Sequence, residues 1–154
     1  MAQRPSRTAG FTLIEMFAVC AIIGILVTFA IPKLHTLLTK ARNARAIGDI
    51  VAIQTDLMAL EAQGQPLPST LAGIGRGNMR DPWGRPYQYL VFPPGPGVPA
   101  GARRDRFLVP VNSTFDLYSL GPDGASSPPF TAGPSHDDIV RANDGGFIGL
   151  ASKY

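Results

Sequence analysis

The chain has 154 residues and a formal net charge of +3 at pH 7; 45% of its residues are hydrophobic, 16% are charged and 8% are aromatic. This length suffices for one modest folded domain beside a membrane segment, and the sequence lacks the basic residues interleaved with aromatics that are typical of nucleic-acid-binding surfaces. The single cysteine, Cys20, excludes an intramolecular disulfide, and the separation of His35 from His136 leaves no zinc-ligand spacing.

Residues 11–32 form an almost purely apolar run in which Glu15 is the only carboxylate. As a helix this run spans roughly 33 Å, at about 1.5 Å per residue, and therefore crosses a hydrocarbon core of about 30 Å. It is longer than the apolar part of a secretory signal peptide, which is usually about 7 to 15 residues. We therefore predict a transmembrane helix. Because an ionised side chain in hydrocarbon is costly, Glu15 is a functional candidate.

The segment GFTLIE at residues 10–15, preceded by a short basic leader, resembles the processing and assembly motif of type IV pilins and type II secretion pseudopilins. The resemblance implies that a prepilin peptidase removes residues 1–10 by cutting after Gly10. It also implies that the peptidase methylates the new amine of Phe11, and that Glu15 acts in filament assembly.

Elementary electrostatics agrees with this assembly role. The amine of Phe11 lies about one helical turn from Glu15, and the same amine of a neighbouring subunit is an equivalent partner. Because a buried charge without a partner is strongly destabilising, Glu15 is expected to favour docking of a new subunit in one axial register. The simpler alternative is a membrane anchor whose Glu15 side chain reaches toward the interface. That alternative explains neither Gly10 nor the leader.

The resemblance further implies a single-pass protein of the bacterial inner membrane, with the residues after Pro32 in the periplasm. Charge alone favours the opposite orientation, since more basic residues follow the apolar run than precede it. Those after the run are Lys33, Lys40, Arg42 and Arg45, against Arg4 and Arg7 before it. We give the processing motif more weight. The later basic cluster is interpreted as a solvated helix face, with contacts to lipid headgroups or to acidic neighbours as alternatives.

Residues 33–64 are predicted to continue the helix outside the membrane and to pack one apolar stripe on a small domain. Apolar residues recur there at three- and four-residue steps: Leu34, Leu37, Leu38, Ala41, Ala44, Ile47, Val51, Ile53, Leu57 and Leu60. The segment Gln-Gly-Gln-Pro at 63–66 is a helix stop. Gly24 and Pro32 are weak points of the helix. The resemblance implies that this stretch extends or unwinds in the filament, and a plain kink is the alternative.

Residues 65–154 are rich in proline and glycine and are predicted to form one small globular β domain, so that the fold class is α+β with a small antiparallel sheet. Three segments are predicted as strands, the second weakened by Pro110: 87–92, 107–111 and 115–120. The segment 93–106 is predicted to be an exposed hairpin or loop. A short helix with a serine cap is predicted at 69–74.

Two motifs narrow the resemblance to the major pseudopilins of type II secretion. They are DPWGRPY at residues 81–87 and FDLYSLGPDG at residues 115–124. The first is interpreted as a tight turn that places Trp83 over the core. For the second, the resemblance implies a metal-binding loop that holds calcium. Matched residue by residue, its ligands are the side chains of Asp123, Asp137 and Asp138 and the carbonyls of Leu120 and Ser135.

The chemistry of this loop suits calcium, which prefers six to eight oxygen ligands from carboxylates and carbonyls. The alternative is an ordinary turn with solvated aspartates, because Pro-Asp-Gly is a common turn sequence. Compared with the family pattern, additional residues between Gly124 and Ser135 make this loop longer.

The resemblance as a whole implies a subunit that polymerises into a periplasmic pseudopilus and drives export of folded proteins across the outer membrane. Its implied partners are further copies of itself, minor pseudopilins, the prepilin peptidase, membrane lipid, and an inner-membrane assembly platform with its ATPase. The alternative is a type IV pilus or competence pilin that uses the 93–106 loop for adhesion or DNA uptake. A membrane-tethered enzyme would require a recognisable nucleophile and base, which the sequence does not offer.

Overall fold

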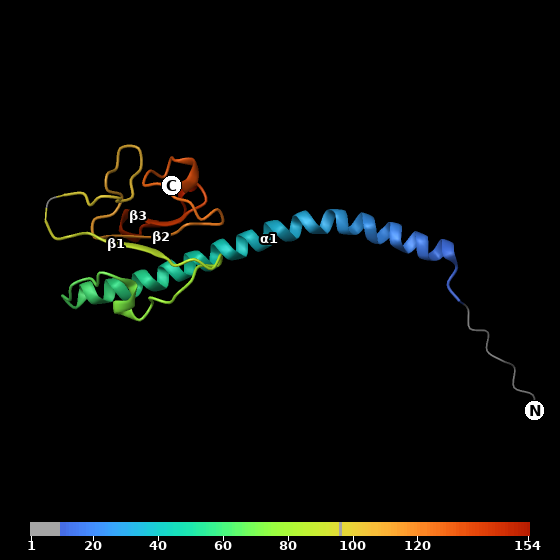
Figure 1. Ribbon diagram of the computed structural model, residues 1–154, viewed down its shortest axis with the longest axis horizontal. Coiled ribbons are helices and arrows are strands. Elements are labelled where there is room, and N and C mark those ends of the chain that lie inside the picture. The colour runs from blue at the N-terminus through green and yellow to red at the C-terminus, as the bar shows by residue number, and fades with distance from the viewer. Residues whose placement is uncertain (1–9, 96) are drawn as a thin grey trace, which may run out of the picture. The chain divides into compact units, whose positions relative to one another are not determined.

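The computed structural model describes residues 10–95 and 97–154. Within these residues, helix α1 (Leu13–Ala62) is followed by strands β1 (Gln88–Val91), β2 (Phe115–Ser119), β3 (Ile139–Ala142) and β4 (Phe147–Leu150) (Figure 1). Short 3-10 helices lie at Leu71–Ile74, Gly133–Ser135, Asn143–Gly145 and Ala151–Lys153. The predicted α+β fold class, a long N-terminal helix and a small antiparallel sheet, is confirmed.

The chain divides into two compact units, the first ending at Thr39 and the second running from Lys40 to Tyr154. In the first unit every side chain from Gly10 to Thr39 is exposed, and this part of α1 is long and apolar enough to cross a membrane. A helix that is apolar all round is stable in lipid or against other helices rather than in water. The first unit is therefore a candidate membrane anchor.

Helix α1 is continuous through both of the weak points predicted from the sequence, Gly24 and Pro32. The hydroxyl of Thr28 donates to the carbonyl of Gly24 at 2.9 Å, and that of Thr36 donates to the carbonyl of Pro32 at 3.1 Å. These side chains bond within the helix, as threonine does where its hydroxyl has no better partner.

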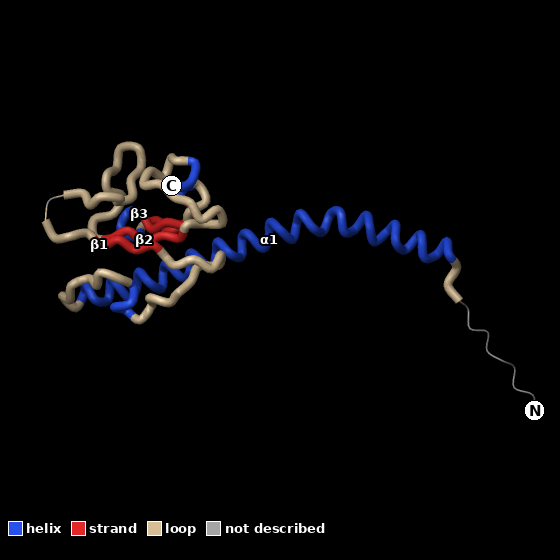
Figure 2. Tube along the Cα trace, viewed as in Figure 1, coloured by secondary structure: helices blue, strands red, loops and turns tan. Residues whose placement is uncertain are grey.

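In the second unit, the four strands form an antiparallel sheet in the order β1-β2-β3-β4. Successive residues of a strand point to opposite faces. Phe115 and Leu117 of β2 pack with Ile50, Ile53 and Leu57 of α1 in the main core, beside which Figure 2 shows the strands in red. A smaller cluster on the other face contains Val111, Phe130, Val140, Ala142 and Ala151.

The strands agree only in part with the sequence predictions. Those predicted at 87–92 and 115–120 are confirmed by β1 and β2. The strand predicted at 107–111 is wrong, because Phe107, Leu108 and Val109 are exposed and the segment makes only an isolated bridge between Asp105 and Leu108. The sequence analysis missed β3 and β4, which complete the sheet.

Three local predictions also need correction. The buried residues of α1 are Ala46, Ile50, Ile53 and Leu57. The predicted stripe is therefore right at Ile53 and Leu57, and wrong where its members are exposed, at Leu34, Leu37, Leu38, Ala41, Ala44 and Val51. The short helix is the 3-10 turn Leu71–Ile74, and its N-cap is Thr70, without a side-chain capping bond, rather than a serine. The loop at 93–106 is confirmed as a loop, but Arg103 in it is only 2% exposed.

Candidate functional site

The start of α1 holds Glu15 in a reciprocal hydrogen-bonded arrangement with Thr12. One oxygen of the Glu15 carboxylate accepts from the Thr12 backbone N–H at 2.8 Å and from the Thr12 hydroxyl at 2.7 Å. In return, the Glu15 backbone N–H donates to the Thr12 hydroxyl oxygen at 3.3 Å. This is a capping box, in which Thr and Glu three residues apart satisfy the free N–H groups of a helix start.

The processing residues Gly10 and Phe11 lie directly before this capping box, and Phe11 is 79% exposed. The amine of Phe11 predicted as the partner of Glu15 forms only after cleavage at Gly10, so that pairing stays a prediction. In the structure the carboxylate is bonded to Thr12, a partner that the sequence analysis missed. The Thr-x-x-Glu spacing of residues 12–15 is the sequence signal that identifies Thr12 as this partner.

The turn at residues 81–87 is organised around the buried carboxylate of Asp81, as the interpretation of a tight turn requires. One Asp81 oxygen accepts from the backbone N–H groups of Trp83 at 3.0 Å and Arg85 at 2.8 Å. The other accepts from the hydroxyl of Ser119 on β2 at 2.6 Å. Trp83 is partly buried against the main core, which confirms its predicted position.

Arg85 connects this turn to the predicted metal-binding loop. Its guanidinium donates to the carbonyl of Gly121 at 2.6 Å and to that of Pro122 at 3.3 Å. It also fills the space where a side chain at Gly124 would lie, and Gly124 has a φ of 73°. Glycine is required at this position because of both the close approach and the left-handed conformation. The two sequence motifs are therefore parts of one structural assembly.

The predicted calcium ligands lie in one loop region, between the end of β2 and the start of β3. The Asp123 backbone N–H donates to a carboxylate oxygen of Asp137 at 3.1 Å, so these two aspartates are adjacent. A side chain at Gly121 would collide with Asp137, which packs directly against that glycine. The carbonyl of Leu120 accepts from the Gly124 N–H at 3.2 Å.

The third predicted aspartate, Asp138, is completely buried and has partners other than the first two. Its Oδ2 accepts from a guanidinium nitrogen of Arg103 at 2.8 Å and from the hydroxyl of Ser126 at 2.5 Å. Its backbone N–H donates to the carbonyl of Ser135 at 3.2 Å. Its Oδ1 is buried without a hydrogen-bond partner in the described structure. Burial raises the pKa of Asp138 to about 6, against the opposing effects of Ser126 and Arg103.

These positions give a mixed result for calcium. The donors are all oxygens, and one buried carboxylate oxygen of Asp138 is unpaired, which suits a hard cation. However, in residues 10–95 and 97–154 no three Asp, Glu, His or Cys side chains lie close enough together to hold a metal ion. The donor chemistry therefore fits, while the three carboxylates are not gathered: that of Asp123 accepts from the Ala125 N–H at 2.8 Å, that of Asp137 from the Asp123 N–H, and that of Asp138 from Arg103 and Ser126.

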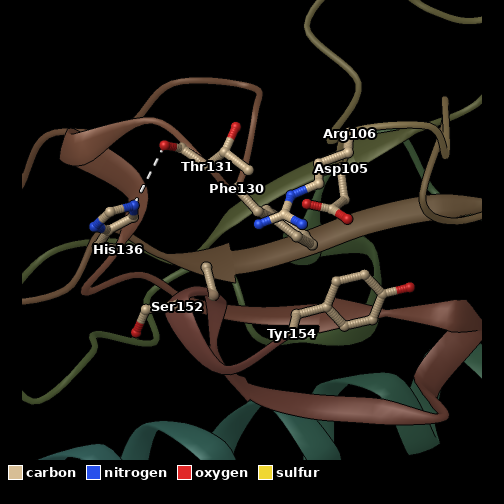
Figure 3. A pocket seen from close by; sticks show the side chains of 8 residues that line it. Asp105, Arg106, Phe130, Thr131, His136, Ser152 and Tyr154 are labelled. Atoms are coloured by element: carbon tan, nitrogen blue, oxygen red, sulfur yellow. Dashed lines mark hydrogen bonds between the residues drawn. The ribbon is translucent and has the colours of Figure 1, made fainter.

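A surface pocket of about 360 Å³ lies between the 105–106 segment, the 130–136 segment and the last residues of the chain (Figure 3). It is lined by polar and aromatic side chains, among them Arg106, Phe130, Thr131, His136 and Tyr154. The His136 Nε2 lies 3.3 Å from the carbonyl oxygen of Thr131. This contact occupies the imidazole with a main-chain group and does not build a pair of nucleophile and base.

A long apolar helix with a capped glutamate in its first turn, followed by a small antiparallel sheet packed on its C-terminal part, is the architecture of a pilin-like subunit whose first unit is a candidate membrane anchor. Residues 5–31 match the family described as "Prokaryotic N-terminal methylation motif". This match covers the second half of the leader, the proposed cleavage position and almost all of the apolar run.

Curated relatives specify which pilin-like protein this is. The chain is 34% identical to the type II secretion system core protein G of Pseudomonas aeruginosa over 75% of this chain and 84% of that protein. It is 30% identical to the protein of the same name from Dickeya chrysanthemi, over 90% of this chain and 89% of that protein. It is 29% identical to that of Vibrio cholerae, over 77% of this chain and 83% of that protein. No solved structure matches the chain significantly. The chain therefore belongs to the type II secretion system core protein G family, the major pseudopilins.

Proposed function

We propose that this chain is the repeating subunit of a type II secretion pseudopilus, inserted in the inner membrane through the apolar part of α1 with its second unit in the periplasm. The observation that carries the proposal is the capped Glu15 at the start of α1, whose apolar part up to Thr39 is fully exposed, shortly after the proposed cleavage position at Gly10. Membership of the core protein G family supports the secretion role over that of an adhesive or competence pilus.

The proposed assembly step uses the apolar surface of the first unit. The apolar side chains from Phe11 to Leu38 are exposed, and they become buried when the helices of successive subunits pack together. After cleavage, the amine of Phe11 offers Glu15 an ionic partner within one subunit or between neighbours. A carboxylate that lacks such a partner among packed helices is strongly destabilising, so a subunit docks only in the register that provides one.

The test of this proposal is Glu15→Ala, with Glu61→Ala as the matched control at an exposed position near the end of the same helix. Glu15→Ala is expected to leave leader cleavage and membrane insertion intact and to abolish pseudopilus growth and secretion. Glu61→Ala is expected to assemble normally. Normal filaments from the Glu15 variant contradict the proposal. If a strain in which the gene for this chain is deleted loses twitching or DNA uptake but still secretes, the chain is a pilus subunit instead.

The proposed partners follow from the same role. They are further copies of this chain, minor pseudopilins, a prepilin peptidase acting at Gly10 and Phe11, and an inner-membrane assembly platform with its ATPase. The names of the relatives describe a core component of a secretion system, which agrees with a structural rather than an enzymatic role. Cross-linking of the assembled filament in the membrane, followed by mass spectrometry, tests this set of partners.

We also propose that the loop between β2 and β3 binds calcium. The carboxylates of Asp123, Asp137 and Asp138 and the carbonyls of Leu120 and Ser135 would hold the ion, with the unpaired Oδ1 of Asp138 as one ligand atom. Calcium would neutralise the adjacent negative charges and stabilise the folded state by mass action. Titration calorimetry of the full chain in detergent is expected to detect binding that Asp123→Ala weakens and Asp105→Ala, in the 93–106 loop, does not. Equal binding by the wild type and Asp123→Ala removes Asp123 from the site.

A further inference from the structure

Arg103 is the one buried residue of a run of four charged residues, Arg-Arg-Asp-Arg at 103–106, that the sequence places at the end of a loop. The Arg103 side chain is 2% exposed and that of its ionic partner Asp138 is fully buried, with 2.8 Å between Nη2 and Oδ2. The backbone N–H of Arg103 donates to the Asp116 carboxylate at 2.6 Å, which fixes the residue to β2. The next residue, Arg104, is exposed.

The guanidinium of Arg103 holds the long segment before β3 at three points. Nη1 donates to the hydroxyl of Ser126 at 2.5 Å and to the carbonyl of Ser127 at 2.8 Å, and Nη2 donates to Asp138. Ser127 is held in turn by Ser135, whose hydroxyl accepts from the Ser127 N–H at 2.9 Å and donates to the Ser127 carbonyl at 2.6 Å. One cation thus ties both ends of the segment 126–138 together.

The partners of this guanidinium are a carboxylate, a carbonyl and a hydroxyl, which are oxygen donors of the kinds that bind calcium in proteins. The positive charge also lies over two aromatic rings, 4.4 Å from the centre of Tyr118 and 5.1 Å from that of Phe130. Both contacts favour a cation at this position. The contact with Phe130, which is 2% exposed, also helps to hold that ring in the folded segment. The arginine therefore supplies a cationic partner on the Oδ2 side of Asp138.

We infer that Arg103 is a built-in cation that pairs with Asp138 and keeps the segment 126–138 folded in the absence of metal. This segment therefore does not depend on calcium for its structure, and a bound calcium ion adds stability to a segment that is already ordered. The inference goes beyond the proposed function because it rests on the contacts of Arg103 and not on calcium binding.

Proteolysis at Phe130 tests the inference on the full chain in detergent micelles. Chymotrypsin, which needs no metal ion for catalysis and stays active in EDTA, cuts after large aromatic residues, and Phe130 is accessible to it only when the segment opens. Wild type is expected to resist cleavage in EDTA as well as in calcium, with calcium at most slowing the cleavage further. Arg103→Met, which keeps most of the volume but removes the charge, is expected to be cut at least tenfold faster in EDTA. Arg104→Met, the same substitution at the adjacent exposed arginine, is expected to behave like wild type.

Arg103→Lys separates charge from packing, because it keeps a positive charge but loses the planar hydrogen-bonding fork. The lysine variant is expected to be cut more slowly in EDTA than Arg103→Met. This comparison stays informative even where the methionine variant folds poorly. The inference is overturned if wild type needs calcium to resist cleavage, if Arg103→Met is as resistant as wild type in EDTA, or if the lysine and methionine variants are equally sensitive. Absence of calcium binding in calorimetry leaves these results unchanged and counts only against the calcium proposal.

Discussion

The functional predictions depend on two carboxylates, Glu15 at the start of α1 and Asp138 before β3, and the structure satisfies them in opposite ways. Glu15 is bonded to Thr12, three residues away, on an exposed helix. Asp138 is buried and pairs with Arg103, 35 residues away. The first arrangement is local and remains open to new partners, whereas the second is long-range and closed to solvent.

This difference indicates in which process each carboxylate acts. Glu15 has Thr12 as its partner in the single subunit, and nothing covers it in the first unit, so it is open to the exchange proposed above, for the amine of a cleaved Phe11. Asp138 cannot exchange Arg103 without opening the smaller hydrophobic cluster around Phe130. The first carboxylate suits assembly, and the second suits the stability of the folded unit.

Asp138→Leu is expected to give the largest effect and tests the closed side of the comparison. It leaves the Arg103 guanidinium buried without a counter-ion, which costs about 3 to 5 kcal/mol of unfolding free energy. Chemical denaturation of the full chain in detergent, followed by the fluorescence of Trp83, measures the loss. The double variant Arg103→Met/Asp138→Leu is expected to recover most of it, because an apolar pair of similar volume replaces the ion pair. A double variant as unstable as the single one contradicts the ion-pair explanation.

Asp81→Ala is expected to cost about 2 to 3 kcal/mol, because two backbone N–H groups and the Ser119 hydroxyl lose a buried acceptor. The same denaturation experiment measures it. Ser119→Ala removes the long-range bond to Asp81 and a weaker bond from the Gly121 N–H at 3.3 Å, but leaves both bonds within the turn. It is expected to cost about 1 kcal/mol, which separates the local part of this turn from its attachment to β2. Equal losses for the two variants would show that the turn itself contributes little.

The sequence was informative where the interactions are local. The apolar run and its helical period predicted α1 to within two residues at each end, and the Trp83 turn and the strands β1 and β2 were recognised from short motifs. The buried stripe was misplaced in its first half because the helical period of apolar residues continues through positions 34–44, where the apolar side chains are exposed. Its buried residues begin only at Ala46.

The sequence was less informative where the interactions are long-range. Each of β3 and β4 has only four residues. Arg141 within β3 is buried, with bonds to Gln54 of α1 at 2.8 Å and to the Phe115 carbonyl at 2.9 Å. An arginine in a four-residue strand hides the apolar pattern, and Gly149 does the same in β4. Arg103 was missed for a similar reason, since its neighbours in the sequence are charged and its partner is distant.

Thr12→Ala tests the open side of the comparison and is expected to have a smaller effect. It removes the hydroxyl of the capping box, which costs about 1 kcal/mol of helix stability at the first turn. Amide hydrogen exchange of the uncleaved chain in detergent is expected to quicken roughly fivefold at Glu15, where the N–H loses its acceptor, and in the adjacent first turn. Thr12→Ser keeps the acceptor and is expected to exchange like wild type. Rapid exchange in the serine variant contradicts the capping role.

Phe107→Ser is expected to give the smallest effect. It distinguishes the strand predicted at 107–111 from the exposed loop of the structure. The side chain of Phe107 is 100% exposed, so its replacement is expected to change the unfolding free energy by less than about 0.5 kcal/mol. A strand packed on the sheet, as the sequence pattern predicted, would lose about 1 kcal/mol or more from the same change, because an aromatic residue would leave a half-buried pleated surface. Denaturation followed by Trp83 fluorescence distinguishes the two. Phe107 belongs to an exposed apolar run with Leu108 and Val109, so a variant with unchanged stability but impaired assembly would place this loop at a contact between subunits.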